Sequence, residues 1–519
     1  MKTDGTIKQD EYDMARLGKK QELKRNFRLV SILGFTCILM ATWESVLLTS
    51  SMGLYNGGPA GMVYGYIVTF LGILATAVSL AEIASISPTS GGQYHWVSEF
   101  APSHYQRFLS FLTGSLPHPR TTCYLHIRCL LLLVLSHTKN PTGVGWLSVL
   151  GYQAAFASLC FLCSGLILEF IAIVRSMTSN TAFVPDGWQK TLLIIGVSSL
   201  ATVVNIWFSD GLAAIESIIL CLHILGFFAI IIPLWVMGDA KPGREVFQAF
   251  SNDGGWPNMT MACLVGQLGA LYSFAGVDCA THMSEEVSDA GFVALVTFLY
   301  TMGDPTSVLN PPSDFPFIKA FENATGSWKI AVGLASIILA MEPCACISLL
   351  ASTSRQTFSF ARDKGLPASK RLAYVNPISC IPVYSVVCTG LITMILGLLN
   401  IVSTAAFNAA ASLAIASILS SYVISIGCFL FARTMRSAPI PSGRFSMRRL
   451  GVGFNVLSIV YLTIEIIFSF FPQTPQFDVK TMNWAIVFWI GAVIFATAQY
   501  FCHGRNVYQS PVMHVVKND

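Results

Sequence analysis

Two stretches of this sequence place acidic and polar residues inside long apolar runs. Thr42-Trp43-Glu44-Ser45 interrupts the first run near its middle, and Ser273-Phe274-Ala275-Gly276-Val277-Asp278 interrupts a later run in a comparable place. A carboxylate at the centre of a bilayer costs about 2.5 to 3.5 kcal/mol on insertion scales, so we expect Glu44 and Asp278 to face a polar cavity. A helix kink or a buried hydrogen bond would explain either break alone, but the two together favour a functional site.

The chemistry of such breaks is binding, not catalysis. Where a helix unwinds, unpaired N–H groups can hold a carboxylate and unpaired C=O groups can hold an ammonium. A zwitterion or an amine can then be bound without a charged partner for every atom. Two discontinuous helices in corresponding places of two halves are typical of an inverted-repeat transporter.

Other titratable residues lie in apolar runs. Glu216 and His223 are seven residues apart and share one face of a helix. They could form a proton relay, because histidine titrates near neutral pH, but a satisfied hydrogen bond between helices is the interpretation we favour. Glu82 ends another run, while Glu342 and Glu465 belong to no recognisable motif.

The composition of the chain indicates the environment of these residues. The chain of 519 residues is 54% hydrophobic and 11% charged, whereas soluble domains carry roughly 25% charged residues. We therefore expect a protein embedded in a lipid bilayer. Spanning elements there must be helices or a closed barrel, and long apolar runs without alternation select helices. The predicted fold is an all-α membrane bundle.

Runs of about 20 apolar residues predict about twelve spans, with boundaries uncertain by a few residues. They are Phe27–Ser51, Ala60–Ile86, Trp146–Val174, Thr191–Phe208, Ala213–Met237, Met261–His282, Phe292–Met302, Ile330–Ser354, Pro382–Leu399, Ala405–Ala432, Val452–Phe471 and Trp484–Phe501. The domain organisation is then an N-terminal tail (1–26), a membrane domain (27–502) and a short C-terminal tail (503–519). The N-terminal tail is too long and charged for a cleavable signal peptide.

Basic residues predict the orientation. They collect in the N-terminal tail and in the predicted loops after spans eight and ten, so both termini should be cytoplasmic. The basic residues of these two loops are Arg355, Arg362, Lys364, Lys370, Arg371, Arg433, Arg436, Arg444, Arg448 and Arg449. Two glycosylation sequons, at Asn258 and Asn323, then fall on the external side. The net charge of +4 is explained by the inner loops and indicates no nucleic-acid partner.

The sequence predicts neither a metal site nor an enzyme. Most of the fourteen cysteines lie in spans, where cysteine acts as a small apolar residue. Cys160 and Cys163 form a C-x-x-C motif, but no second pair or nearby histidine completes a zinc site. No Gly-x-Ser-x-Gly or other catalytic motif occurs, and no cofactor is expected.

Motifs around the second predicted span resemble a known family. Gly57-Gly58-Pro59-Ala60, Ala81-Glu82-Ile83-Ala84 and Pro88-Thr89-Ser90-Gly91-Gly92-Gln93-Tyr94 are similar to the second helix of amino acid/polyamine/organocation (APC) permeases. The string His95-Trp96-Val97-Ser98 is most similar to the fungal GABA and choline permease branch. The resemblance covers most of the chain.

This resemblance implies a LeuT-like 5+5 inverted repeat with discontinuous helices 1 and 6. The residues that match the family's unwound segments, Trp43 to Ser45 and Phe274 to Asp278, would line the substrate site. Substrate would be a small amine or amino acid, such as GABA, choline or a polyamine, imported by alternating access. The proton is expected as coupling ion from the family, not from a residue pattern.

The resemblance also indicates residues near the inner end. Glu82, in the family-like Ala-Glu motif, could serve gating or structure, or handle protons. The segment Phe360 to Pro367, with Arg355 ahead of it, is similar to the family's loop after span eight. Its ion-pairing residues, Arg355, Arg362 and Asp363, are expected to take part in an inner gate.

Two segments depart from the family pattern. Residues 115–145 separate Phe111-Leu112-Thr113-Gly114 from the family-like Trp146-Leu147, and we interpret them as a retained intron; a re-entrant or regulatory loop is the alternative. The seventh predicted span, near 291–302, is too short to cross about 30 Å of bilayer. The gene model could be wrong there, or the protein impaired.

The main alternative function is a non-transporting relative, either a nutrient sensor or a defective product. The C-terminal tail is short, whereas a sensor usually needs a long cytoplasmic extension, which favours transport. The plasma membrane is the expected location, with the vacuolar membrane as the alternative. The sequence does not discriminate among the candidate substrates.

Overall fold

The computed structural model describes residues 41–87, 92–101, 144–178, 183–274, 276, 290–309, 315–377, 379–402, 405–435, 445–476, 478–479, 481–504 and 507–508. The N-terminal tail, nearly all of the predicted insert 115–145 and most of the C-terminal tail lie outside these ranges. Within them the chain is helical, apart from a short antiparallel ladder between β1 (Asn56–Gly57) and β2 (Ser251–Asn252).

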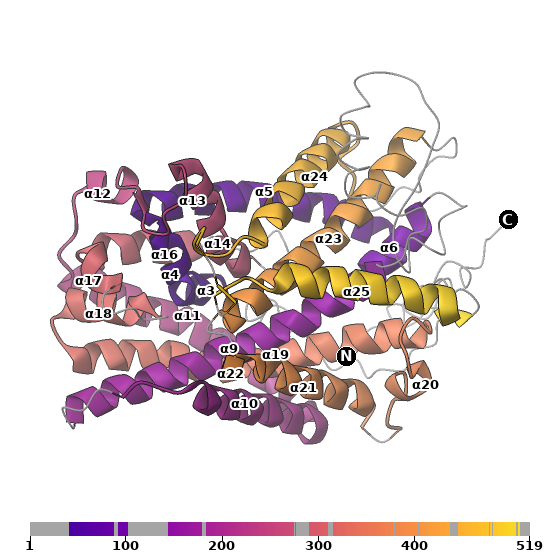
Figure 1. Ribbon diagram of the computed structural model, residues 1–519, viewed down its shortest axis with the longest axis horizontal. Coiled ribbons are helices and arrows are strands. Elements are labelled where there is room, and N and C mark those ends of the chain that lie inside the picture. Colours follow the sequence, from indigo (N-terminus) through magenta and orange to yellow (C-terminus); the bar gives the residue numbers. More distant parts are fainter. Residues whose placement is uncertain are drawn as a thin grey trace, which may run out of the picture.

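Nine helices of the described residues are long and apolar enough to cross a membrane, and each coincides with a predicted span. Figure 1 shows the largest of them lying side by side. They are α5 (Gly58–Ile86), α9 (Val144–Thr178), α10 (Gly187–Trp207), α11 (Leu212–Met237), α19 (Trp328–Arg362), α21 (Val383–Gly397) with α22 (Leu399–Val402), α23 (Ala406–Met435), α24 (Leu450–Ser469) and α25 (Ala485–Gln499), which a π-turn extends (Tyr500–Gly504).

The other three predicted spans are broken or short. The described residues of the first form α3 (Thr42–Leu48) and α4 (Ser50–Tyr55), and those of the sixth form α13 (Met259–Gly266) and α14 (Leu268–Ser273). The described residues of the seventh form α16 (Ala290–Thr301), whose 12 residues extend about 18 Å at 1.5 Å per residue. The count of twelve spans and the inverted repeat therefore stay predictions.

Short helices mark the two ends of the bundle (Figure 1). One end carries α12 (Gly243–Phe247), α17 (Pro305–Leu309) and α18 (Pro316–Thr325), and the other carries α6 (Gln93–Phe100) and α20 (Ser369–Leu372). We call the first the outer end and the second the inner end, following the orientation that the basic residues predict.

Packing distinguishes a central helix from peripheral ones. In α23 the most apolar window is entirely buried, and this helix packs against α9 and α24. By contrast α11, α21 and α25 expose large apolar side chains such as Leu225, Ile395 and Ile494. A soluble protein would not leave so much apolar surface uncovered, so these helices have the surface expected of contact with lipid.

The predicted loops after spans eight and ten begin later than the sequence indicated. Arg355 and Arg362 lie within α19, and Arg433 lies within α23. The prediction was wrong because it ended each helix at the last residue of its apolar run. No proline or glycine interrupts the chain between Ser354 and Arg362, and basic side chains are favoured in the last turn of a helix.

Candidate functional site

The break in the first apolar run falls at Thr49 and not at Trp43 to Ser45, which are helical. Thr49 adopts φ −101° and ψ 9°, and its N–H and its hydroxyl both donate to the Ser45 carbonyl, at 2.9 and 2.6 Å. These two bonds close α3, and the φ and ψ of Thr49 depart from helical values, so the helix is interrupted there before α4 begins. At its other end α3 begins directly after Ala41, whose φ of 38° lies in the left-handed region.

The later break falls where the sequence predicts it. Helix α14 ends at Ser273, Phe274 is not helical, and Gly276 has a φ of 89°, which favours glycine. A further interruption, at Gln267, separates α13 from α14. Ala275, Val277 and Asp278 lie outside the described residues, so their part in a site stays a prediction.

The two broken helices touch each other. The Thr49 hydroxyl also lies 3.2 Å from the Gly269 carbonyl oxygen of α14. A Cβ atom on Gly269 would lie 2.9 Å from the Thr49 carbonyl oxygen, closer than real Cβ contacts. Glycine at 269 therefore allows the first break to pack directly on α14.

Glu44 is paired inside the bundle. Its Oε1 lies 2.6 Å from His223 Nδ1 on α11, and the Glu44 side chain is almost fully buried. Trp43 packs beside the pair, with its ring centroid 5.7 Å from that of His223 and 6.0 Å from that of Phe227. A buried carboxylate that faces an imidazole can bind a proton or an ammonium group.

Glu216 and His223 each contact a side chain of another helix, which is the arrangement that the sequence analysis favoured over a relay between them. His223 contacts Glu44, while Glu216 accepts a 2.5 Å hydrogen bond from Ser348 on α19 and interacts electrostatically with Arg355. Seven helical residues separate the two side chains by about 10 Å along the axis, and each side chain finds a nearer partner on another helix.

Glu342, to which the sequence analysis assigned no role, lies at the middle of α19. It is 2% exposed, and its Oε2 has no hydrogen-bond partner among the described residues. Electrostatically it interacts with Glu44 and Tyr272, and the Tyr272 hydroxyl lies 3.0 Å from the Ser158 hydroxyl. A carboxylate within an apolar run was the available signal in the sequence.

Polar contacts bridge the inner end. Glu82 Oε1 accepts a 2.5 Å bond from Arg433 Nη2, and it also accepts from the backbone N–H of Met447 at 2.9 Å. Tyr94 on α6 donates to Asp363 at 2.9 Å. Arg362 stacks on Phe358 at 5.5 Å from the ring centroid. Of the predicted gate residues, the structure brings Glu82 to α23 and Asp363 to α6.

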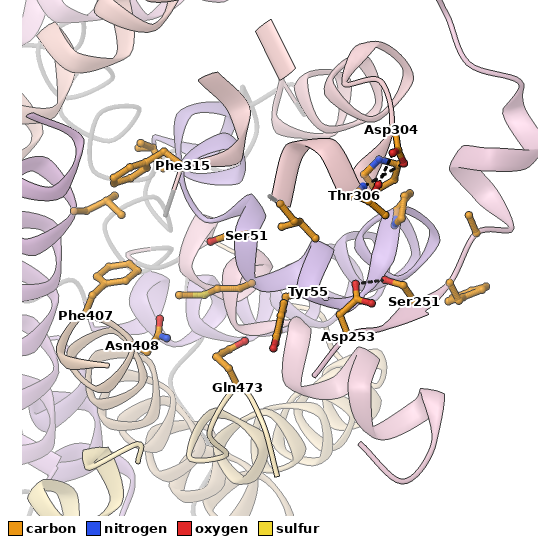
Figure 2. Close-up of a pocket in the computed structure, with 18 of the residues that line it drawn as sticks. Ser51, Tyr55, Ser251, Asp253, Asp304, Thr306, Phe315, Phe407, Asn408 and Gln473 are labelled. Atoms are coloured by element: carbon orange, nitrogen blue, oxygen red, sulfur yellow. Dashed lines mark hydrogen bonds between the residues drawn. The ribbon is translucent and has the colours of Figure 1, made fainter. Parts of the chain in front are cut away.

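A cavity of about 760 Å³ opens at the outer end (Figure 2). Asp253 and Asp304 lie on one side of it, and Phe315, Phe407 and Asn408 lie on the other. Asp304, in the loop before α17, accepts hydrogen bonds from the Thr306 N–H and hydroxyl, which lower the pKa of its carboxyl group. Its negative charge therefore persists at the mouth of the cavity.

The cavity leads toward the broken helices. Leu48, Ser51 and Met52 of α3 and α4 line it, together with Phe161 of α9. The ring of Phe407 lies 6.2 Å from the ring of Tyr272, centroid to centroid. Tyr272 in turn contacts the buried Ser158, so the two rings link the lining of the cavity to the interior of the bundle.

The two predicted glycosylation sites differ in structure, and both lie near the outer end. Asn258 caps α13 through its side-chain oxygen, which accepts from the Met261 N–H at 2.9 Å. Asn323 lies within α18, and its Nδ2 donates to the Met302 carbonyl at 2.8 Å. The amide nitrogen that a glycan would modify is thus engaged in Asn323.

The sequence matches one protein-family model, described as amino acid permease, over residues 27–117 and 136–495. The gap between these two matched parts, residues 118–135, falls inside the segment that the sequence analysis marked as an insert.

Relatives from fungi align over nearly the whole chain. The choline transporter of Saccharomyces cerevisiae is 26% identical, with 94% of this chain and 83% of the relative aligned. The GABA-specific permease of the same species is 26% identical over 98% of this chain and 86% of its own. Amino-acid permease 2 of Neurospora crassa is 25% identical over 96% and 88%.

Proposed function

We propose that this chain, which belongs to the amino acid permease family, is a secondary active transporter that imports a small amine or amino acid by alternating access. The family consists of transporters and not of enzymes. The relatives named for choline, GABA and amino acids delimit the class of substrate to test. Choline, GABA, another amino acid or a polyamine are the candidates.

The observation that carries this proposal is the asymmetry between the two ends. At the outer end a cavity of about 760 Å³ extends to α3 and α4. At the inner end Glu82 is bound to Arg433, and Tyr94 is bound to Asp363. A transporter that waits for substrate on the outer side needs this combination of an open side and a closed side.

In the proposed cycle substrate enters the outer cavity and binds where the two broken helices meet. The helices α3, α4, α13 and α14 then move against the scaffold of α9, α10, α19 and α21. This movement closes the outer cavity, and the contacts of Glu82 and Asp363 separate to open the inner side. Gly276 and the left-handed Ala41 are the points at which the broken helices can change direction.

We propose protons as the coupling ion and the Glu44–His223 pair as the place where a proton binds. The pair is buried, and it joins α11 to α3, which is one of the helices that move in the proposed cycle. Protonation changes the charge of a pair that bridges two helices, so it shifts the balance between their arrangements. The plasma membrane, with both termini cytoplasmic, is the proposed location.

The experiment is uptake of labelled choline, GABA, putrescine and amino acids in cells that lack their own permeases for these compounds. We expect saturable uptake of at least one of them, abolished by a protonophore. The variants Glu44→Gln and Asp278→Asn should reduce uptake more than they reduce the amount of protein at the surface. Failure of every amine and amino acid with a surface-localised protein would overturn the transport proposal.

A further inference from the structure

Glu342 is a buried acid whose position in the bundle indicates a ligand. It lies near the middle of the 35-residue helix α19, far from either helix end, and is 2% exposed. Its Oε2 atom has no hydrogen-bond partner in the described part of the chain. A buried carboxylate without a partner is costly, so it either takes up a proton or binds a cation.

The charges around Glu342 do not neutralise it. Among the described residues, the titratable groups that interact electrostatically with it are Glu44 on α3, Tyr272 on α14, Cys163 on α9, and Cys344 and Cys346 on its own helix. None of these groups is basic. Glu44 is paired with His223, and Glu216 interacts electrostatically with Arg355, so each of these two carboxylates has a basic partner. Glu342 is thus the carboxylate of this region for which the described residues supply no cation.

Hydrogen-bonding groups next to Glu342 are also suited to a cation. Pro343 follows it within α19 and has no N–H, so the Leu339 carbonyl lacks its usual helical donor. The region therefore offers two acceptors, a carboxylate and a carbonyl, one turn apart. Tyr272, with which Glu342 interacts electrostatically, has an aromatic ring of the kind that attracts quaternary as well as protonated amines.

Two aromatic rings link the outer cavity to the surroundings of Glu342. Phe407 lines the cavity, and its ring packs edge-on against Tyr272, at an interplanar angle of 70°. Tyr272 in turn belongs to α14, directly before the break at Phe274. A change at the break that turns α14 would therefore move the Tyr272 ring relative to Phe407.

We propose that Glu342 binds the positively charged nitrogen of the transported substrate, an ammonium or quaternary ammonium group. This inference rests on the proposed transport function. It adds to that function a binding residue, Glu342, and the requirement that the substrate carry a positive charge. A substrate with a cationic nitrogen is bound by Glu342, while a neutral compound of the same shape is not. Glu342 thereby selects amines and zwitterions over uncharged solutes.

The test compares Glu342→Gln with wild type in the uptake of whichever of labelled choline, GABA or putrescine the wild type transports. Glutamine keeps the shape and removes the charge, so we expect the apparent KM to rise by about tenfold or more. Glu342→Asp keeps the charge and should retain more uptake than Glu342→Gln. The matched control is Glu465→Gln, because Glu465 is equally buried (2% exposed) but lies on α24.

A second measurement needs no variant and distinguishes charge from shape. Choline and its uncharged isostere 3,3-dimethyl-1-butanol are compared as competitors of wild-type uptake. We expect choline to compete about tenfold better or more, since it alone can pair with the carboxylate.

The outcomes separate this inference from the proposed function. An active wild type whose Glu342→Gln variant transports with unchanged KM would overturn the inference alone, and would indicate that Glu342 holds a proton. Equal competition by the two isosteres would overturn it as well, even if Glu342→Gln fails to reach the surface. A surface-localised wild type that takes up no amine would overturn the proposed function, and the inference with it.

Discussion

Glu44 Oε1 and His223 Nδ1 lie 2.6 Å apart across 179 positions of sequence. The contact joins α3 to α11, and it pairs one oxygen of a carboxylate that is 1% exposed. A buried ion needs a partner. The relative position of α3 and α11 therefore depends on the charges of Glu44 and His223.

Loss of one member of this pair should destabilise the protein more than loss of both charges. In His223→Ala the Glu44 carboxylate stays buried without its partner, and we expect the free energy of unfolding to fall by about 3 to 5 kcal/mol. Adding Glu44→Gln to His223→Ala should recover part of this loss. Thermal unfolding of the purified proteins in detergent measures both effects, and strictly additive effects would show that the pair is not coupled.

The contact between the two broken helices requires a glycine. In Gly269→Ala the new methyl group meets the Thr49 carbonyl oxygen at 2.9 Å, so we expect a loss of about 1 to 3 kcal/mol in stability and a lower uptake rate. Gly333→Ala is the control, since a Cβ at that helical position has no atom within 4 Å. Equal thermal stability of the two variants would contradict the close approach.

The Glu82–Arg433 ion pair should hold the inner end closed. Glu82→Arg places two cations together and loses the bond to the Met447 N–H, so we expect uptake to fall strongly. The double variant Glu82→Arg/Arg433→Glu restores opposite charges and should regain part of the uptake. If the double variant is no better than the single one, the attraction between the two side chains does not keep this end closed.

The two sequons should behave differently. Asn258→Gln is expected to remove the shift in electrophoretic mobility that an endoglycosidase produces, whereas Asn323→Gln leaves that shift unchanged. Asn323→Gln should instead lower stability by about 1 kcal/mol, because it disturbs the 2.8 Å bond to the Met302 carbonyl. A glycan lost on mutation of Asn323 would show that this bond opens in the cell.

Residues 115–145 should be dispensable. The family model matches the chain on both sides of 118–135, so we expect a protein lacking 115–145 to accumulate at the membrane and to transport at least as well as the full chain. Uptake by the deleted protein and the sequence of the mature transcript together decide the origin of the segment. If the transcript retains the segment and its deletion abolishes uptake, residues 115–145 are a functional loop and not an intron.

Much of the fold was predictable from local properties. Helices such as α5 and α23 coincide with predicted spans, because lipid requires long apolar runs whose backbone groups bond internally. The family resemblance, carried by motifs such as Gly57 to Ala60, is confirmed by the match along the chain. The helix end at Ser273 was also predicted, since the glycine and polar residues that follow it form a local signal.

The partners of the polar side chains were not predictable in this way. The sequence indicated that Glu44, Glu216 and His223 lie within apolar runs, and it favoured hydrogen bonds to other helices for Glu216 and His223, but it did not indicate which residues would be their partners. In the structure His223 binds Glu44, and Glu216 binds Ser348. Helix starts and stops such as Thr49 and Arg362 also depend on bonds and on helix extension that an apolar window does not reveal.

The sequence by itself therefore determined that this is a helical membrane protein of a permease family, where nearly all of its long helices lie and which residues are too polar for lipid. Only the tertiary structure decided which of those residues meet, and that Glu342 is left among the described residues without a cation. The physical reason is that membrane insertion depends on the composition of one segment, whereas the pairing of a buried charge depends on side chains that other helices bring to it.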